Sequence, residues 1–276
     1  MPVTDQECGI MRLPQTGRRW SMGEREITVR TPDGEMTAFV THPAGGGPLP
    51  VAVLYMDGVG YREQIQENAR RFAAGGYCCV APDLFYRGGP RLSFDLSRLT
   101  AQGFGGPEAE RMMSLVRSLT PERVISDTEA LLQAIATDPA VRPGPKVCVG
   151  YCMGARFALH AAAALSDQFV AAACIHPGAL VTDQPDSPHH DLDAVRGELY
   201  VAFAENDRSA TPEVVERFRG EMERRGIRGV VERVPGTAHG YAMADLAVYD
   251  RAASERHFER TLELWGRNLS AQPVGA

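Results

Sequence analysis

The segment Gly150-Tyr151-Cys152-Met153-Gly154 places a thiol between two glycines at the spacing Gly-x-Cys-x-Gly. It follows an apolar run, Val147–Val149, that predicts a buried strand, and it leads into the helical pattern of Met153–Leu165. A strand that turns directly into a helix leaves little room for side chains on either side of the turn, so glycine fits there. The thiol would stand at a helix N-terminus, whose partial positive charge favours a thiolate. We therefore predict that Cys152 is a nucleophile.

An acid and a histidine follow in the order that this kind of nucleophile needs. A nucleophile between a strand and a helix is the nucleophile elbow of α/β-hydrolases, in which the acid and then the histidine come later in the chain. Asp207 follows the predicted strand Leu199–Ala204, and His239 follows the strand Val230–Val234. Open α/β sheets bind ligands at the carboxyl ends of their strands. The sequence therefore predicts a triad of Cys152, His239 and Asp207, with Glu205 as a local alternative to Asp207.

The elements that must position these residues alternate between strand and helix from residue 24 onward. A hairpin is predicted at Ile27–Arg30 and Met36–Thr41, around the turn Pro32-Asp33-Gly34. Beyond it, alternating elements predict a mostly parallel sheet with helices on both faces. The further predicted strands are Val51–Met56, Tyr77–Ala81, Val147–Val149, Phe169–Ile175, Leu199–Ala204 and Val230–Val234, and the helices are Glu63–Ala74, Glu108–Leu119, 121 to about 137, Met153–Leu165, Pro212–Arg225 and Ala247–Leu269.

The fold class expected from this order is α/β, an α/β-hydrolase fold in a single domain over residues 23–276. Residues 1–22 are predicted to form an N-terminal arm on the surface. Residues 84–107 show no clear period and contain many glycines and arginines. The stretch 84–118 is therefore a candidate lid or pocket-shaping segment.

Composition excludes several function classes. The 276 residues include 29 basic and 35 acidic side chains, a net charge of −6, and the basic ones are scattered, so we expect no nucleic-acid or membrane partner. No apolar run approaches the roughly 18–20 residues of a membrane span. Four of six cysteines (78, 79, 148 and 174) lie in apolar runs, and no Cys-x-x-Cys pair exists, so we expect no metal and no cofactor. With no signal-like segment at residues 1–22, these cysteines indicate the cytoplasm.

Other polar residues receive weaker interpretations. His176 also follows a strand, and a structural or substrate-shaping role is favoured over catalysis. The run His189-His190-Asp191 looks like a set of metal ligands, but adjacent histidines cannot easily chelate one ion, so a solvated loop is favoured. Arg87, Arg91 and Arg98 could hold an anionic substrate, although a solvated loop is again the favoured interpretation.

With these residues in view, the chain resembles the dienelactone hydrolase (carboxymethylenebutenolidase) family. The matching pieces are 53–58, 81–87, 150–154 and the Asp207 and His239 segments, so the resemblance runs from about residue 24 to 270. It implies a Cys-His-Asp triad that acts on esters or lactones. In the family an acid after the first buried parallel strand holds the resting thiol. The matching residue is Asp57, one methylene shorter than the usual glutamate, and it would hold the thiol or line the substrate pocket. Where family members carry a carboxylate-binding arginine four residues after the histidine, this chain has Met243.

The expected reaction is hydrolysis of a small ester or lactone through a thioester acyl-enzyme. Cys152 would attack the carbonyl while His239 takes the thiol proton and Asp207 orients the imidazole. The backbone N–H groups of Met153 and Gly58 would bind the oxyanion. The alternatives are a general carboxylesterase or thioesterase, a non-catalytic ligand-binding α/β-hydrolase fold, and a thiol redox sensor. Monomer and homodimer both remain open.

Overall fold

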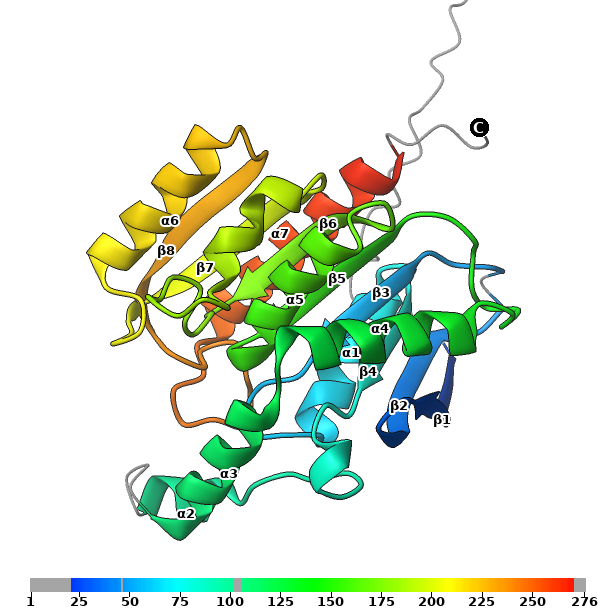
Figure 1. Ribbon diagram of the computed structural model, residues 1–276. Helices are drawn as coiled ribbons and strands as arrows, with labels where there is room; N and C mark the ends of the chain where they lie inside the picture. Colours follow the sequence, from blue (N-terminus) through cyan, green and yellow to red (C-terminus); the bar gives the residue numbers. More distant parts are fainter. Residues whose placement is uncertain (1–20, 46, 102–105, 271–276) are drawn as a thin grey trace, which may run out of the picture.

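One eight-stranded sheet runs through the molecule in a computed structural model that describes residues 21–45, 47–101 and 106–270 (Figure 1). Its strand order is β1-β2-β4-β3-β5-β6-β7-β8. The pairs β1–β2 and β2–β4 are antiparallel, and all the other pairs are parallel. The antiparallel edge and the parallel remainder confirm the α/β architecture predicted from the alternation of strands and helices.

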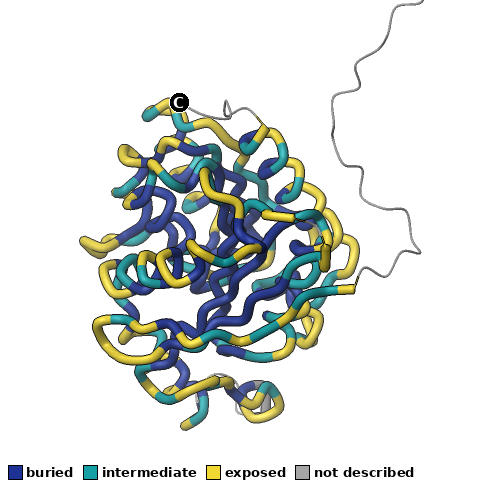
Figure 2. Tube along the Cα trace, turned by 90° about the vertical axis from the view of Figure 1, so that its right-hand side faces the viewer, coloured by how far each residue is buried: buried dark blue, intermediate teal, exposed yellow. Residues whose placement is uncertain are grey.

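The strands lie close to their predicted positions. They are β1 (Met22–Thr31), β2 (Gly34–Pro43), β3 (Val51–Tyr55), β4 (Cys78–Pro82), β5 (Lys146–Tyr151), β6 (Phe169–Ile175), β7 (Glu198–Asn206) and β8 (Gly229–Ala238). All five residues of β3 and of β4 are buried, as expected of parallel strands covered on both faces. Figure 2 shows these buried residues gathered along the strands in the middle of the molecule.

Helices cover both faces of the sheet. They are α1 (Glu63–Ala74), α2 (Leu96–Ala101), α3 (Pro107–Ser118), α4 (Pro121–Ile135), α5 (Met153–Ala164), α6 (Pro212–Arg224) and α7 (Arg251–Ser270), with short 3-10 turns η1 (Tyr86–Gly88) and η2 (Pro188–Ala194). In Figure 1, α4 and α5 lie in front of the sheet and α7 lies behind it. On that rear face α1 packs against α7, where the Phe72 ring lies 4.7 Å from Phe258 and 4.8 Å from Trp265. Such aromatic contacts bury large apolar areas and hold the layer in place.

Two sequence-based boundaries need correction. Met22, predicted to belong to the arm, is the first residue of β1 and pairs with Pro43. Residues 1–20 of the predicted arm lie outside the described residues. The stretch 84–107, which shows no period in the sequence, contains η1 and α2.

The segment 84–118 is joined to the loop after β3 by backbone hydrogen bonds. Tyr61 N donates to Leu92 O at 2.8 Å, and Phe94 N donates to Val59 O at 2.9 Å. Helix α3 also reaches this loop, since a Cβ built on Gly58 would lie 3.5 Å from Val116 Cγ2. The segment therefore shapes the surroundings of the loop that follows β3.

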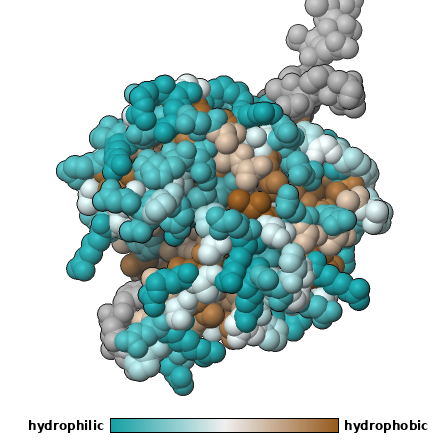
Figure 3. Space-filling model, in the orientation of Figure 1, coloured by the Kyte–Doolittle hydropathy of each residue, from teal (hydrophilic) through white to brown (hydrophobic). Residues whose placement is uncertain are grey.

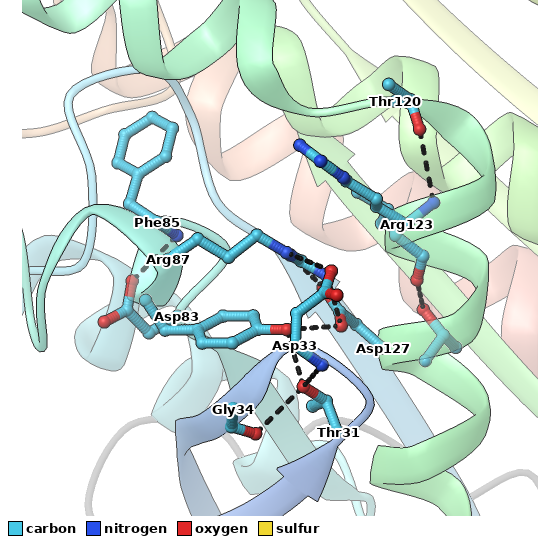
Figure 4. A network of polar contacts seen from close by, with 12 residues as sticks. Thr31, Asp33, Gly34, Asp83, Phe85, Arg87, Thr120, Arg123 and Asp127 are labelled. Atoms are coloured by element: carbon cyan, nitrogen blue, oxygen red, sulfur yellow. Dashed lines mark hydrogen bonds and ion pairs between the residues drawn. The ribbon is translucent and has the colours of Figure 1, made fainter.

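A polar network fixes the beginning of this segment against the hairpin and α4 (Figure 4). The Arg87 guanidinium donates two hydrogen bonds to the Asp127 carboxylate, at 2.7 and 2.9 Å, and a third to Asp33 at 2.7 Å. Tyr86 Oη donates to Asp127 at 2.9 Å and lies 2.6 Å from Thr31 Oγ1. Asp127 is almost fully buried, so its charge depends on Arg87 for compensation.

The surface seen in the orientation of Figure 1 is mostly hydrophilic, with hydrophobic residues interspersed near its centre (Figure 3). Within the described part of the chain, none of the helices combines the length and the apolar character that crossing a membrane requires.

Candidate active site

Cys152 stands in a strained turn between β5 and α5. Its φ and ψ are 52° and −114°, a conformation that costs free energy for a residue with a Cβ and that clusters at functional sites. The two glycines make this turn possible. A Cβ on Gly150 would lie 2.1 Å from Gly154 O, and a Cβ on Gly154 would lie 2.4 Å from both Met56 O and Tyr55 O. The backbone of α5 therefore approaches the end of β3 more closely than any side chain would allow.

The three residues predicted to form a triad meet at the carboxyl ends of β5, β7 and β8. His239 Nε2 lies 2.9 Å from Cys152 Sγ, and His239 Nδ1 donates to Asp207 Oδ2 at 2.5 Å. The Asp207 side chain is buried, whereas about a third of the His239 side chain is exposed. The imidazole thus lies between a thiol and a carboxylate, and it remains open to a substrate.

Contacts within this set favour the protonated form of the His239 imidazole. Burial alone would lower the pKa of His239, but the neighbouring Cys152 thiolate and the hydrogen bond to Asp207 raise it to about 11. Burial would raise the pKa of Asp207, yet its hydrogen bond to His239 holds that pKa below its ordinary value. The carboxylate therefore stays ionised and stabilises the protonated imidazole.

Asp207 is held by a residue that sequence reasoning missed. Ser209 Oγ donates to Asp207 Oδ1 at 2.7 Å, and the Ser209 N–H donates to the same oxygen at 2.8 Å. The Asp-x-Ser spacing is the signal for such an Asx turn. Glu205, the alternative acid, accepts instead from Gly236 N at 2.8 Å and lies near Arg233.

The two predicted oxyanion donors belong to the start of α5 and to the loop after β3. The Met153 N–H is the first of α5, and the first N–H groups of a helix have no acceptor within the helix. Gly58 follows β3, whose end lies against Gly154. No described residue accepts a hydrogen bond from the Gly58 N–H. Both groups are therefore available to an external acceptor.

Asp57 has a partner other than the one expected for an acid that holds the thiol. Its carboxylate accepts from Arg62 Nη1 at 2.6 Å and Arg62 Nη2 at 3.0 Å, and its Oδ1 also accepts from Val59 N at 3.0 Å. The Cys152 thiol is instead paired with His239. The structure thus pairs Asp57 with Arg62 and not with the thiol, and a place for Asp57 in the substrate pocket stays a prediction.

Met243, which stands where the resembling family carries an arginine, is fully buried. Its sulfur accepts a weak hydrogen bond from Asn68 Nδ2 at 3.6 Å. The side chain packs into the core on the α1 side, so this position presents no group to a ligand.

His176 lies against the His239 imidazole. It is fully buried, its φ is 37°, and its ring centroid lies 5.3 Å from that of His239 in an edge-to-face arrangement. Burial and the charge of His239 lower the pKa of His176 well below its ordinary value, so it stays neutral. The structural role favoured for this residue fits its complete burial.

The remaining candidates take part in local contacts. His189 is buried and lies 2.8 Å from Ser187 Oγ, which corrects its assignment to a solvated loop. Asp191 bonds to His160 at 2.7 Å. Each of the three arginines forms ion pairs with protein carboxylates. Arg87 pairs with Asp127 and Asp33, Arg91 pairs with Glu26, and Arg98 pairs with Asp95.

Comparison with known proteins identifies the family of this chain. A family model described as "Dienelactone hydrolase family" matches residues 36–269. The chain belongs to the dienelactone hydrolase family. A "Putative carboxymethylenebutenolidase" of Salmonella typhi is 25% identical over 259 residues, which cover 85% of this chain and 89% of that protein.

Solved structures agree with the fold. A "Putative Dienelactone Hydrolase" from Klebsiella pneumoniae superposes with a TM-score of 0.77 at 20% identity, covering 90% of this chain and 99% of that one. A "Dienelactone Hydrolase-like Promiscuous Phospotriesterase" from metagenomic libraries superposes with a TM-score of 0.70 at 20% identity, covering 90% and 98%. The α/β-hydrolase fold and the predicted family resemblance are therefore confirmed. The dienelactone hydrolase family member described here is a hydrolase that acts on carboxylic ester bonds.

Proposed function

We propose that this family member hydrolyses small esters or lactones through a Cys152 thioester intermediate. The observation that carries the proposal is the chain of contacts from Cys152 Sγ through the His239 imidazole to the Asp207 carboxylate, at 2.9 and 2.5 Å. In the resting site His239 holds the thiol proton. The thiolate attacks the carbonyl, the oxyanion is bound by the N–H groups of Met153 and Gly58, and imidazolium protonates the departing oxygen. Neutral His239 then activates a water that hydrolyses the thioester.

The leaving group limits the substrate. A thiolate derives from an acid of pKa about 8.5, so it is expelled from the tetrahedral intermediate more readily than an alkoxide. The intermediate proceeds to the thioester when the departing oxygen is itself a stabilised anion, as in aryl and enol esters. Activated esters and enol lactones are therefore the proposed substrates, in preference to alkyl esters and amides.

Charge limits the substrate as well. Position 243 presents a buried methionine, and Arg62 beside the site already directs all five of its N–H donors at protein oxygens. A substrate carboxylate gains no ion pair from either residue. We therefore propose that uncharged activated esters are better substrates than a lactone that carries a carboxylate.

The test compares p-nitrophenyl acetate and a dienelactone as substrates of the wild type, Cys152→Ala and the control Cys174→Ala. Cys174 is a buried thiol on the neighbouring strand β6. We expect Cys152→Ala to lose measurable turnover of both substrates, the control to keep it, and kcat/KM to be higher for the uncharged ester. A Cys152→Ala protein as active as the wild type would refute the thioester mechanism. Equal or better use of the dienelactone would refute the proposed preference.

A further inference from the structure

The two loops that carry reacting groups on either side of Cys152 are joined by one arginine. The first is the turn 57–60 after β3, which carries the Gly58 N–H, and the second is the loop 239–250 after β8, which begins with His239. We propose that Arg62 is a positioning residue that holds these loops in register, so that the Gly58 N–H meets the carbonyl oxygen when Cys152 attacks. This inference rests on the proposed function.

The turn around Gly58 is closed by acceptors that Arg62 binds. Gly60 N donates to Asp57 O at 3.2 Å, which closes a four-residue turn with Gly58 and Val59 at its centre. Val59 N donates to Asp57 Oδ1 at 3.0 Å. Arg62 Nη1 donates to that same carboxylate oxygen at 2.6 Å and to Gly60 O at 3.2 Å. The direction of the Gly58 N–H is therefore set by a turn that the guanidinium holds at both ends.

The other edge of the guanidinium binds the histidine loop. Arg62 Nε donates to Asp245 Oδ2 at 2.6 Å and Nη2 donates to Asp245 Oδ1 at 3.1 Å. Backbone hydrogen bonds tie this loop to its own ends, since Tyr241 N donates to Ala238 O at 3.0 Å and Asp250 N donates to Tyr241 O at 2.9 Å. Asp245 therefore moves with the segment that starts at His239.

Only arginine has the geometry for this junction. A guanidinium presents five donors in one plane, and here all five are used, on two carboxylates and one carbonyl. A lysine ammonium has three donors around one atom and cannot bind two carboxylates side by side in this way. The side chains of Arg62 and Asp57 are 11% and 4% exposed, so water competes little with these bonds.

The experiment uses Arg62→Lys, which keeps the charge, and Asp245→Asn, which weakens only the link to the histidine loop. The matched control is Glu255→Gln, because Arg71 and Glu255 form another arginine–carboxylate pair between α1 and the C-terminal part of the chain, at 2.6 Å. Two quantities are measured on each protein. One is kcat and KM for p-nitrophenyl acetate, and the other is the rate at which iodoacetamide alkylates Cys152 as a function of pH, followed on the Cys152 peptide by mass spectrometry.

Alkylation separates the oxyanion site from the nucleophile, because it needs the thiolate but forms no oxyanion. We expect kcat to fall about 10- to 100-fold in Arg62→Lys and about tenfold in Asp245→Asn, with KM nearly unchanged, because a donor displaced by about 1 Å loses most of its effect. The pH profile of alkylation should stay that of the wild type, and Glu255→Gln should match the wild type throughout.

Two results would overturn the inference. Unchanged kcat in both Arg62→Lys and Asp245→Asn would show that the junction does not position the donor. A parallel loss of alkylation and hydrolysis would show that Arg62 acts on the thiolate–imidazolium pair instead. Failure of the proposed function has a different signature, namely a Cys152→Ala protein as active as the wild type, and the inference would then fall with it.

Discussion

Asp83 is a buried carboxyl group whose ionisation should make a distinct contribution to the pH dependence of stability. It follows β4 and is fully buried, and its oxygens accept from Phe85 N at 3.0 Å and Arg91 N at 2.7 Å. Burial raises the pKa of this carboxyl from 3.8 to about 6, and the charge of Glu26 acts in the same direction. A rise of about 2 units corresponds to about 3 kcal/mol between the two protonation states.

The direction of the change in stability with pH depends on whether the folded or the unfolded chain loses the Asp83 proton first. As the pH rises above about 4, the unfolded chain ionises at Asp83 while the folded protein keeps the carboxyl neutral up to about pH 6. The stabilisation is therefore fully present below pH 4 and is lost as the pH rises through 6. By pH 7.5 this group should have lowered the free energy of unfolding by about 3 kcal/mol relative to pH 4.

The perturbation is Asp83→Asn, which keeps the shape of the side chain and cannot ionise. Urea unfolding followed by circular dichroism gives the free energy of unfolding of the wild type and the variant from pH 4 to 7.5. The amide loses one acceptor, which adds an offset that does not vary with pH. We expect the difference, wild type minus variant, to fall by about 3 kcal/mol across this range.

The matched control is Asp167→Asn, since the Asp167 side chain is 82% exposed and its ion pair with Arg196 lies at the surface. Its difference from the wild type should be flat. A flat difference for Asp83→Asn as well would refute the reasoning. If the free energy of unfolding of the wild type minus that of Asp83→Asn rose with pH, the two backbone hydrogen bonds to Asp83 would outweigh the cost of burying its charge.

Two further substitutions test the site and the polar network. Asp207→Asn should lower kcat by about 10³- to 10⁴-fold with little change in KM, because the amide favours the wrong tautomer of His239. Steady-state kinetics measure this loss, and a variant that kept full activity would argue against the triad. Arg87→Met leaves the buried Asp127 carboxylate uncompensated and should cost about 3–5 kcal/mol in thermal or urea unfolding. The exposed pair of Arg98 provides the control, and Arg98→Gln should change stability by less than about 1 kcal/mol. Equal losses in the two arginine variants would contradict the assigned difference in burial.

Some elements have a clear pattern in their own sequence, and their first and last residues were predicted correctly. Helix α1 spans Glu63–Ala74 as expected, because its apolar stripe has helical spacing and Gly75-Gly76 ends it. Strand β6 spans Phe169–Ile175, again as expected, because it is a continuous apolar run between polar segments. In both cases local pattern and tertiary environment agree.

Elements held by distant contacts were not predictable in the same way. Helix α2 has only six residues, and its segment is held by the backbone bond from Phe94 N to Val59 O. His189 is buried because η2 packs on the rest of the chain, although its immediate neighbours in the sequence are polar. A single sequence without knowledge of the partners does not contain these contacts in its local pattern.

The candidate site shows the same division. The order and strand-end positions of Cys152, Asp207 and His239 could be read from the sequence, because parallel strands bring their carboxyl ends to one edge. Arg62 could not, because its partner Asp245 lies 183 residues away in the chain.

The register of the parallel strands also determines when the site can exist during folding. Cys152 and His239 are 87 residues apart, and they meet only after β5, β6, β7 and β8 have paired in order. Pairings of such long range close late, because the chain must lose the entropy of large loops before the contacts form. Helices such as α1 can form while Cys152 still lacks its contact with His239. Regain of ester hydrolysis after dilution from denaturant therefore reports completion of this half of the sheet rather than collapse of the chain.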